Sequence, residues 1–334
     1  MKRTVIAGLV AALSVSLAAC APSAGGAPSP SASAAKSYKV GITQIVSHDS
    51  LDAAREGFKK AFTDAGLTVT FDEKNANDDQ STNVSIASTL ASADLDLILA
   101  VSTPSAQALT QVVSSTPVLF TAVTDPVTAG LVTSMDAPGK NVTGTSDMNP
   151  VAEQIALIKK IKPDATSVGI LYSSGEINSE VQVKAAREAA AKEGLAVTEK
   201  AIAETRDVQQ ALASFDVDAL YVPTDNKVVS ALGAVIQVAE TKKIPLVVGE
   251  GDSVRKGGVI TYGLDYTRLG HQTGEMAIRI LTQGANPATM PVETQKDLTV
   301  YVNKAAAQRM GVTIPESLLA GAEIVDSAEA EGTK

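Results

Sequence analysis

Polar residues follow several short apolar runs, in loops where a ligand could be held. Thr103, Pro104 and Ser105 come after an apolar run and begin a segment with helical spacing. The free backbone N–H groups and the dipole of a helix N-terminus favour an anionic group, so we expect a ligand carboxylate there. The alternative interpretation is that Thr103 or Ser105 only caps its helix.

Carboxylates that suit a ligand ammonium lie in similar loops. Asp125 stands between Thr124 and Pro126 after an apolar run, and is either a turn-forming residue or a carboxylate of a binding cleft. Asp225 and Asp252 follow two later apolar runs. An unpaired carboxylate in a cleft would bind an ammonium through charge-assisted hydrogen bonds. We expect one of these three aspartates to hold it.

Each loop alone is weak evidence, since Thr, Asp, Asn and Gly form turns in any fold. Their shared position after apolar runs favours a common cleft, to which Tyr266 is added as one of few aromatic candidates. The candidate ligand-binding residues are Gln44, Ser47, Asp49, Thr103, Pro104, Ser105, Thr124, Asp125, Glu176, Asn178, Thr224, Asp225, Asn226, Glu250, Asp252 and Tyr266.

Motifs of common enzyme classes are absent from the sequence. It contains no G-x-G-x-x-G after the first apolar run, no G-x-x-x-x-G-K-[ST] and no G-x-S-x-G. His271 and Glu275 have helical spacing for a metal, but such a pair more often forms a solvated helix face. The formal net charge is −9, with no basic patch to suggest nucleic acid. We expect a binding protein without enzymatic activity, cofactor or metal.

The first 36 residues have the composition of a targeting segment. Residues 1–19 combine Lys2 and Arg3 with a short apolar run, which predicts a secretory signal peptide. The run ends in Leu-Ala-Ala before Cys20, which resembles the bacterial lipobox and predicts a lipid-anchored cysteine at the mature N-terminus. An ordinary signal peptide with a stray cysteine is the alternative. Residues 20–36, rich in Ala, Ser, Pro and Gly, are expected to form a disordered tether.

The elements that position these loops alternate between short β-branched runs and longer amphipathic segments, which is typical of an α/β fold with parallel sheets. About 300 residues follow the tether, enough for two Rossmann-like lobes. We expect lobe 1 over 37–145, lobe 2 over 146–268, and a C-terminal segment, 269–334, that returns to lobe 1. The expected strands cover 38–42, 67–71, 95–101, 117–120, 141–144, 167–172, 195–202, 219–222, 245–248 and 298–302.

Ligands of open α/β sheets bind at the carboxyl ends of the strands. Two lobes that face each other would therefore place the polar loops of both around one cleft. The N-terminus of the helix after Thr103 would hold a carboxylate in that cleft. An ammonium would lie near Asp125, Asp225 or Asp252.

The chain also resembles a known family, the ABC substrate-binding proteins of periplasmic-binding-protein type that include tryptophan- and tyrosine-associated uptake proteins. The resemblance covers most of the chain after residue 37. It is carried by the segments Leu-Asp-Ala-Ala-Arg-Glu-Gly-Phe at 51–58, Val-Thr-Asp-Pro-Val at 123–127, Asn-Val-Thr-Gly at 141–144, Tyr-Val-Pro-Thr-Asp-Asn at 221–226 and Pro-Val-Glu at 291–293.

This resemblance implies a type I periplasmic-binding-protein fold with a multi-strand hinge, a partner permease and ATPase, and an amino acid as the first ligand class to test. It also implies a monomer, which the lipid on Cys20 would attach to the membrane. It also implies ligand contacts on the loops that contain Thr103 to Ser105, Asp125, Asn178, Thr224 to Asn226 and Asp252.

The nature of the ligand stays open at this point. The sequence contains no Trp and only 3% aromatic residues, which argues against an aromatic ligand held by stacking and leaves a smaller or aliphatic amino acid open. A sugar or nucleoside is the alternative ligand class. A sensor that presents its loaded form to a membrane kinase is the alternative function.

Overall fold

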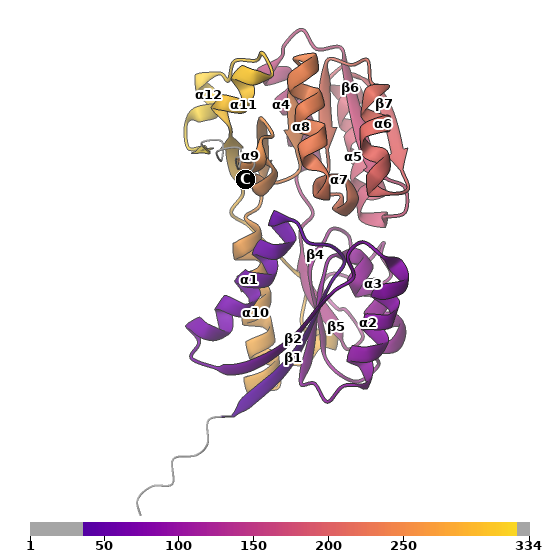
Figure 1. Ribbon diagram of the computed structural model, residues 1–334. Helices are drawn as coiled ribbons and strands as arrows, with labels where there is room; N and C mark the ends of the chain where they lie inside the picture. Colours follow the sequence, from indigo (N-terminus) through magenta and orange to yellow (C-terminus); the bar gives the residue numbers. More distant parts are fainter. Residues whose placement is uncertain (1–35, 326–334) are drawn as a thin grey trace, which may run out of the picture. The chain divides into compact units, whose positions relative to one another are not determined.

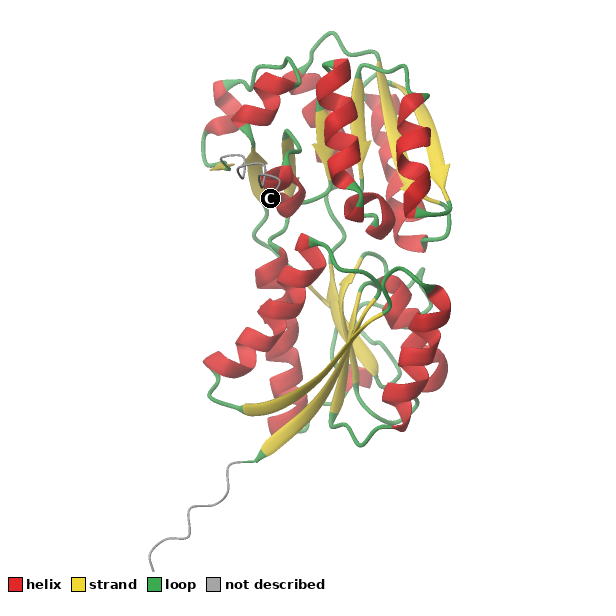
Figure 2. Cartoon of the chain, in the orientation of Figure 1, coloured by secondary structure: helices red, strands yellow, loops and turns green. Residues whose placement is uncertain are grey.

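A computed structural model describes residues 36–325, which contain two mostly parallel β-sheets (Figure 1). The predicted signal peptide, the lipidated Cys20 and nearly all of the predicted tether lie outside the described residues. Figure 2 shows the strands of each sheet with helices packed beside them. The predicted α/β class with two Rossmann-like lobes is confirmed. No helix in 36–325 is long and apolar enough to span a membrane.

The first lobe is built on a six-stranded sheet with the order β11-β5-β4-β3-β1-β2. Helices α1 and α10 pack against each other on one face of this sheet, and α2 and α3 lie together on the other (Figure 1). Its elements are β1 (Ser37–Gln44), α1 (Asp49–Asp64), β2 (Thr68–Asn75), α2 (Gln80–Ser92), β3 (Leu97–Val101), α3 (Thr103–Val112), β4 (Val118–Val123), β5 (Val142–Ser146), α10 (Tyr266–Gln283), η2 (Pro287–Thr289) and β11 (Glu293–Thr294).

The second lobe is built on a seven-stranded sheet with the order β13-β12-β10-β9-β8-β6-β7. Its central strands are fully buried apolar runs, as expected for a parallel sheet that is covered on both faces. Its elements are α4 (Val151–Ile161), β6 (Ser167–Ser173), α5 (Ile177–Lys192), β7 (Ala196–Ile202), η1 (Thr205–Asp207), α6 (Val208–Ala213), β8 (Ala219–Val222), α7 (Asn226–Ser230), α8 (Leu232–Lys242), β9 (Leu246–Val248), α9 (Gly251–Lys256), β10 (Ile260–Gly263), β12 (Thr299–Val302), α11 (Lys304–Arg309), α12 (Glu316–Leu319) and β13 (Glu323–Ile324).

The C-terminal segment divides between the two lobes. Helix α10 packs on α1, and β11 pairs with β5 of the first sheet. Strand β12, however, pairs antiparallel with β10, and β13 pairs with β12, so both belong to the second sheet. The prediction that 269–334 returns to lobe 1 is therefore wrong for residues 299–325. The physical reason is that Tyr301 and Val302 are buried in the second core.

Three segments join the two lobes within the described residues: 147–150, 264–265 and 295–298. This connectivity agrees with the multi-strand hinge that the family resemblance implies. Strand β10, which precedes the second crossing, was missed in the sequence because it has only four residues and ends in a glycine.

Strand β4 continues to Val123, three residues beyond the end of the expected strand 117–120. The strand bulges between Phe120 and Val123, and Ala122 there has a φ of 56°. A non-glycine residue in the left-handed region costs free energy and often marks a functional position. Ala122 therefore marks the carboxyl end of β4 as a candidate functional position.

Glycines allow α1 and α10 to pack closely. A Cβ atom at Gly270 would lie 1.8 Å from the carbonyl oxygen of Ala54, and one at Gly57 would lie 2.1 Å from that of Thr267. Both distances are far below a van der Waals contact, so the two backbones touch directly. This packing holds the N-termini of both helices in place, and residues at those N-termini line the cavity described next.

Candidate functional site

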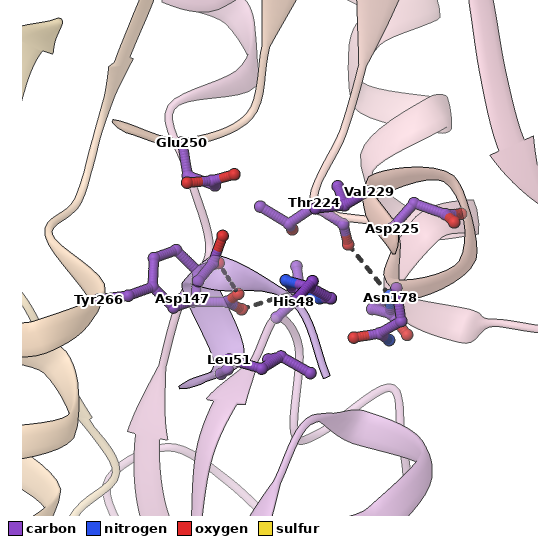
Figure 3. A pocket seen from close by; sticks show the side chains of 13 residues that line it. His48, Leu51, Asp147, Asn178, Thr224, Asp225, Val229, Glu250 and Tyr266 are labelled. Carbon is purple, nitrogen blue, oxygen red and sulfur yellow. Dashed lines mark hydrogen bonds between the residues drawn. The ribbon is translucent and has the colours of Figure 1, made fainter. Parts of the chain in front are cut away.

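A small cavity lies between the two lobes (Figure 3). The centre of a water-sized sphere can occupy about 20 Å³ in it, which is room for about one water molecule. Any larger ligand therefore requires the lobes or the lining side chains to move apart for entry. The first lobe and its crossing segment contribute His48, Ser50, Leu51, Ala122, Thr124, Asp147 and Tyr266, and the second lobe contributes Asn178, Thr224, Asp225, Asn226, Val229 and Glu250.

The ionisable groups around the cavity are mainly acidic. Asp147, Asp225 and Glu250 line it, whereas no lysine or arginine of residues 36–325 does. His48 supplies no compensating charge, because burial lowers its pKa to about 4 and leaves the ring neutral near pH 7. The cavity therefore favours a cationic group such as an ammonium.

Two of the three carboxylates are occupied as helix caps. Asp225 caps α7 by accepting a hydrogen bond from Val228 N at 2.8 Å, and its second oxygen accepts from Ser173 N at 2.5 Å and Ser179 Oγ at 2.6 Å. Glu250 caps α9 and accepts hydrogen bonds from Asp252 N and from the backbone and hydroxyl of Ser253. These contacts use most of the lone pairs of both carboxylates.

Asp147 has more capacity left for a ligand. Its two oxygens accept one side-chain hydrogen bond each, from Thr124 Oγ1 at 3.0 Å and from the hydroxyl of Tyr266. A carboxylate has about four acceptor positions, so lone pairs remain. Burial raises the pKa of Asp147, and a nearby cation would favour its charged form. Asp147 is thus the lining carboxylate best able to receive an ammonium.

The N-terminus of α1 forms another part of the wall. His48 occupies the N-cap position without a side-chain capping bond, and the first N–H groups of a helix have no partner within it. Ser50 Oγ and both ring nitrogens of His48 are buried and lack a hydrogen-bond partner among the described residues. These unpartnered polar groups at the positive end of a 16-residue helix favour an anionic group.

Glu176 lies behind the cavity wall. Its carboxylate accepts hydrogen bonds from Asn178 Nδ2 at 3.0 Å and Asn226 Nδ2 at 2.5 Å, and so orients two lining amides. Burial, reinforced by the charge of nearby Asp225, raises the pKa of Glu176 to about 8. Glu176 therefore keeps its proton in the folded protein at neutral pH, although its ordinary value is 4.5.

This raised pKa predicts a pH dependence of stability. The folded state keeps the proton that the unfolded chain releases, so the contribution of Glu176 to stability is full below pH 4.5 and is lost as pH rises through about 8. Glu176→Gln, which mimics the protonated acid, is expected to flatten the decline of melting temperature between about pH 5 and about pH 9. Glu180→Gln, at an exposed position of α5, the helix that begins directly after Glu176, is the control. An unchanged slope in Glu176→Gln would show that this proton has no effect on folding.

Comparison with known proteins identifies the family. The family model described as "ABC transporter substrate binding protein" matches residues 39–325. The chain belongs to this family. The resemblance of the sequence to ABC substrate-binding proteins is thereby confirmed.

Relatives of this substrate-binding protein have named ligands. A tyrosine-binding protein of Clostridioides difficile (strain R20291) is 42% identical over 275 residues, which cover 80% of this chain and 79% of that protein. A structure from Streptococcus pneumoniae in complex with L-Trp is 36% identical, with a TM-score of 0.83, over 87% of this chain and 100% of that one.

A ligand-free, open structure of a substrate-binding protein with adhesive properties from Clostridium difficile is 42% identical, with a TM-score of 0.66 over 87% of this chain and 100% of that one. The present substrate-binding protein thus resembles the L-Trp complex more in structure, although it is less identical to it in sequence. The two lobes are in contact in this structure, since Lys227 Nζ of the second lobe lies 2.6 Å from Asp78 Oδ1 of the first.

The cavity brings together seven of the sequence-predicted residues of this substrate-binding protein: Thr124, Asn178, Thr224, Asp225, Asn226, Glu250 and Tyr266. Their polar loops do follow strands of both lobes, as expected. Pro104 and Glu176 instead line a neighbouring cavity together with Asp78 and Lys227.

The remaining predicted residues have other surroundings. Gln44 Nε2 and Ser47 Oγ donate hydrogen bonds to Asp52 at 2.8 and 2.5 Å, and Asp49 forms an ion pair with Lys256 at 3.3 Å. Thr103 and Ser105 are buried with unpartnered hydroxyl groups, but neither lines the cavity. The N-terminus of α1 takes the place in the wall that we expected for that of α3.

Two of the three aspartates that were expected to hold an ammonium lie outside the cavity and have structural partners. Asp125 accepts hydrogen bonds from Val127 N and Thr128 N. Of the two interpretations of Asp125, the structure therefore supports the turn-forming residue. Asp252 pairs with Arg255 at 2.7 Å.

Sequence reasoning missed six lining residues: His48, Ser50, Leu51, Ala122, Asp147 and Val229. A signal for Asp147 was present, because it follows the expected strand 141–144 as the other polar loops follow theirs. Ser50 stands at the start of a helix, where a serine commonly serves as a cap, and the apolar residues carried no signal beyond their helical or strand periodicity.

Proposed function

We propose that this chain is the extracytoplasmic solute-binding lipoprotein of an ABC importer, and that it binds an amino acid between its lobes without catalysing a reaction. The observation that carries the proposal is the cavity itself, which places an uncapped helix N-terminus and an acidic residue with free lone pairs in one wall. A zwitterion carries the two charges that these groups favour.

The ligand carboxylate binds at the N-terminus of α1, where it accepts hydrogen bonds from Ser50 Oγ and from backbone N–H groups of the first turn. The ammonium binds Asp147, whose position is held by Thr124 and Tyr266. This assignment replaces the α3 N-terminus and Asp125, Asp225 or Asp252 with other residues, because those groups lie outside the cavity or are already hydrogen-bonded.

The ligand side chain contacts a mixed wall. Leu51, Ala122 and Val229 are apolar, while Asn178, Thr224 and Asn226 offer hydrogen bonds from the second lobe. Such a wall suits a large side chain with a polar end. The L-Trp complex and the tyrosine-binding relative make L-tryptophan and L-tyrosine the first candidates, even though the chain has few aromatic residues for stacking.

Binding closes the lobes, because a ligand that contacts both has higher affinity for the closed state. The loaded protein then delivers its ligand to a permease and its ATPase, acting as a monomer that is attached to the membrane through a lipid on Cys20. The sequence at 17–20, Leu-Ala-Ala-Cys, supports that anchor.

A thermal-shift screen tests the ligand class. The full chain is heated with each of the twenty amino acids and with common sugars and nucleosides, since a bound ligand in excess raises the melting temperature. We expect a selective rise with L-tyrosine, L-tryptophan or both. A rise with a sugar or nucleoside and none with an amino acid would overturn the proposed ligand.

A further inference from the structure

Asp78 connects the two lobes outside the ligand cavity. It lies in the loop between β2 and α2 of the first lobe, where Asn77 and Asp78 have φ angles of 52° and 63°. Two consecutive non-glycine residues in the left-handed region cost free energy. Asp78 N donates to Ile45 O at 2.8 Å, a contact that holds this loop on the first lobe.

The partners of the Asp78 carboxylate belong to two elements of the second lobe. Lys227 Nζ, in α7, lies 2.6 Å from Asp78 Oδ1, and Thr205 Oγ1, in η1, donates to Asp78 Oδ2 at 2.9 Å. Only 19% of the Asp78 side chain and 16% of the Lys227 side chain is exposed. The other ion pair that joins the lobes within residues 36–325, Asp49 with Lys256, is longer at 3.3 Å and has side chains 60% and 40% exposed.

We propose that Asp78, Lys227 and Thr205 form a closure latch, which stabilises the closed arrangement of the lobes and thereby sets ligand affinity without touching the ligand. The latch adjoins the ligand site in the chain, because Lys227 follows Asn226, which lines the ligand cavity. Asp78 and Lys227 line a separate cavity of about 240 Å³ together with Glu176, whose carboxylate accepts a hydrogen bond from Asn226.

The latch acts through the equilibrium between open and closed lobes. Because its contacts cross from one lobe to the other, they exist only when the lobes are together. Removing them lowers the population of the closed state, and the apparent affinity falls by the same factor. The predicted effect on affinity rests on the proposed function, whereas the effect on lobe closure does not.

Lys227→Met tests the latch, since it keeps the aliphatic stem and removes the charge. Calorimetric titration of the full chain with L-tyrosine and with L-tryptophan is expected to show affinity about tenfold weaker than in the wild type, the usual size of a lost charge-assisted hydrogen bond. Thr205→Val is expected to weaken binding less. Lys60→Met is the matched control, because Lys60 forms an ion pair of 2.6 Å with Asp64 inside one helix.

Small-angle X-ray scattering of the same proteins, each with ligand omitted, separates the latch from the ligand assignment. Lys227→Met is expected to have a larger radius of gyration than the wild type and Lys60→Met, at an unchanged melting temperature. If the wild type binds neither amino acid but Lys227→Met still has the larger radius of gyration, the proposed ligand is wrong and the latch stands. Scattering curves and affinities that are the same in Lys227→Met and the wild type would overturn the latch.

Discussion

Asp147→Asn is expected to weaken binding of L-tyrosine and L-tryptophan about 100-fold, because truncating one partner of a buried charge pair leaves the other charge unpaired. The asparagine keeps the shape of the side chain and can still accept a hydrogen bond from Thr124 or Tyr266. The loss therefore reports the missing negative charge beside the ligand ammonium. Calorimetric titration of the full chain measures it.

Asp125→Asn is the matched control for this prediction. Asp125 also follows a strand of the first sheet and has the same side chain, but it forms a turn outside the cavity. Its replacement is expected to leave affinity unchanged. If both variants bind like the wild type, or if Asp125→Asn loses as much affinity as Asp147→Asn, the assignment of the ammonium to Asp147 is wrong.

Gly270→Ala is expected to cause a large loss of stability. The new Cβ would lie 1.8 Å from the carbonyl oxygen of Ala54, so α1 and α10 must separate. Overpacking of this kind costs about 3 kcal/mol, and the obstacle here is backbone that cannot rotate away. Because α1 carries Ser50 and α10 carries Tyr266, ligand affinity is expected to fall as well.

Gly233→Ala controls for the general effect of replacing a helical glycine. Gly233 lies in α8, where an added Cβ meets no atom within 4 Å, so the substitution is expected to be neutral or slightly stabilising. Thermal unfolding of both variants gives the comparison. Equal melting temperatures for Gly270→Ala and the wild type would contradict the close helix packing described above.

The fold could be predicted largely from the periodicity of apolar residues. Runs such as Leu97–Val101 and Ala219–Val222 are continuous and buried, and the helices between them show one apolar face. The return of β12 and β13 to the second sheet could not be predicted, because a short apolar run such as 299–302 pairs equally well with any open sheet edge. That choice depends on tertiary packing around Tyr301.

The site was predicted less completely, since the same residue types serve as ligands and as caps. Asp125 and Asp225 both follow strands, but one forms a turn and the other caps α7. The position of Asp125 outside the cavity and the hydrogen bonds already made by Asp225 distinguish these two from Asp147. Likewise, Ser50 and Thr103 both begin helices, and only the three-dimensional arrangement shows that Ser50 lines the cavity.

Calorimetric titration of the full chain with L-tyrosine and its two truncated analogues tests the central claim most directly. Tyramine lacks the carboxylate, and 3-(4-hydroxyphenyl)propionate lacks the ammonium, so each removes one of the proposed contacts. The account predicts binding of L-tyrosine and a loss of about 100-fold or more for either analogue, because each leaves one buried protein group without its ionic partner. Analogues that bind as tightly as L-tyrosine would contradict recognition of a zwitterion between the N-terminus of α1 and Asp147.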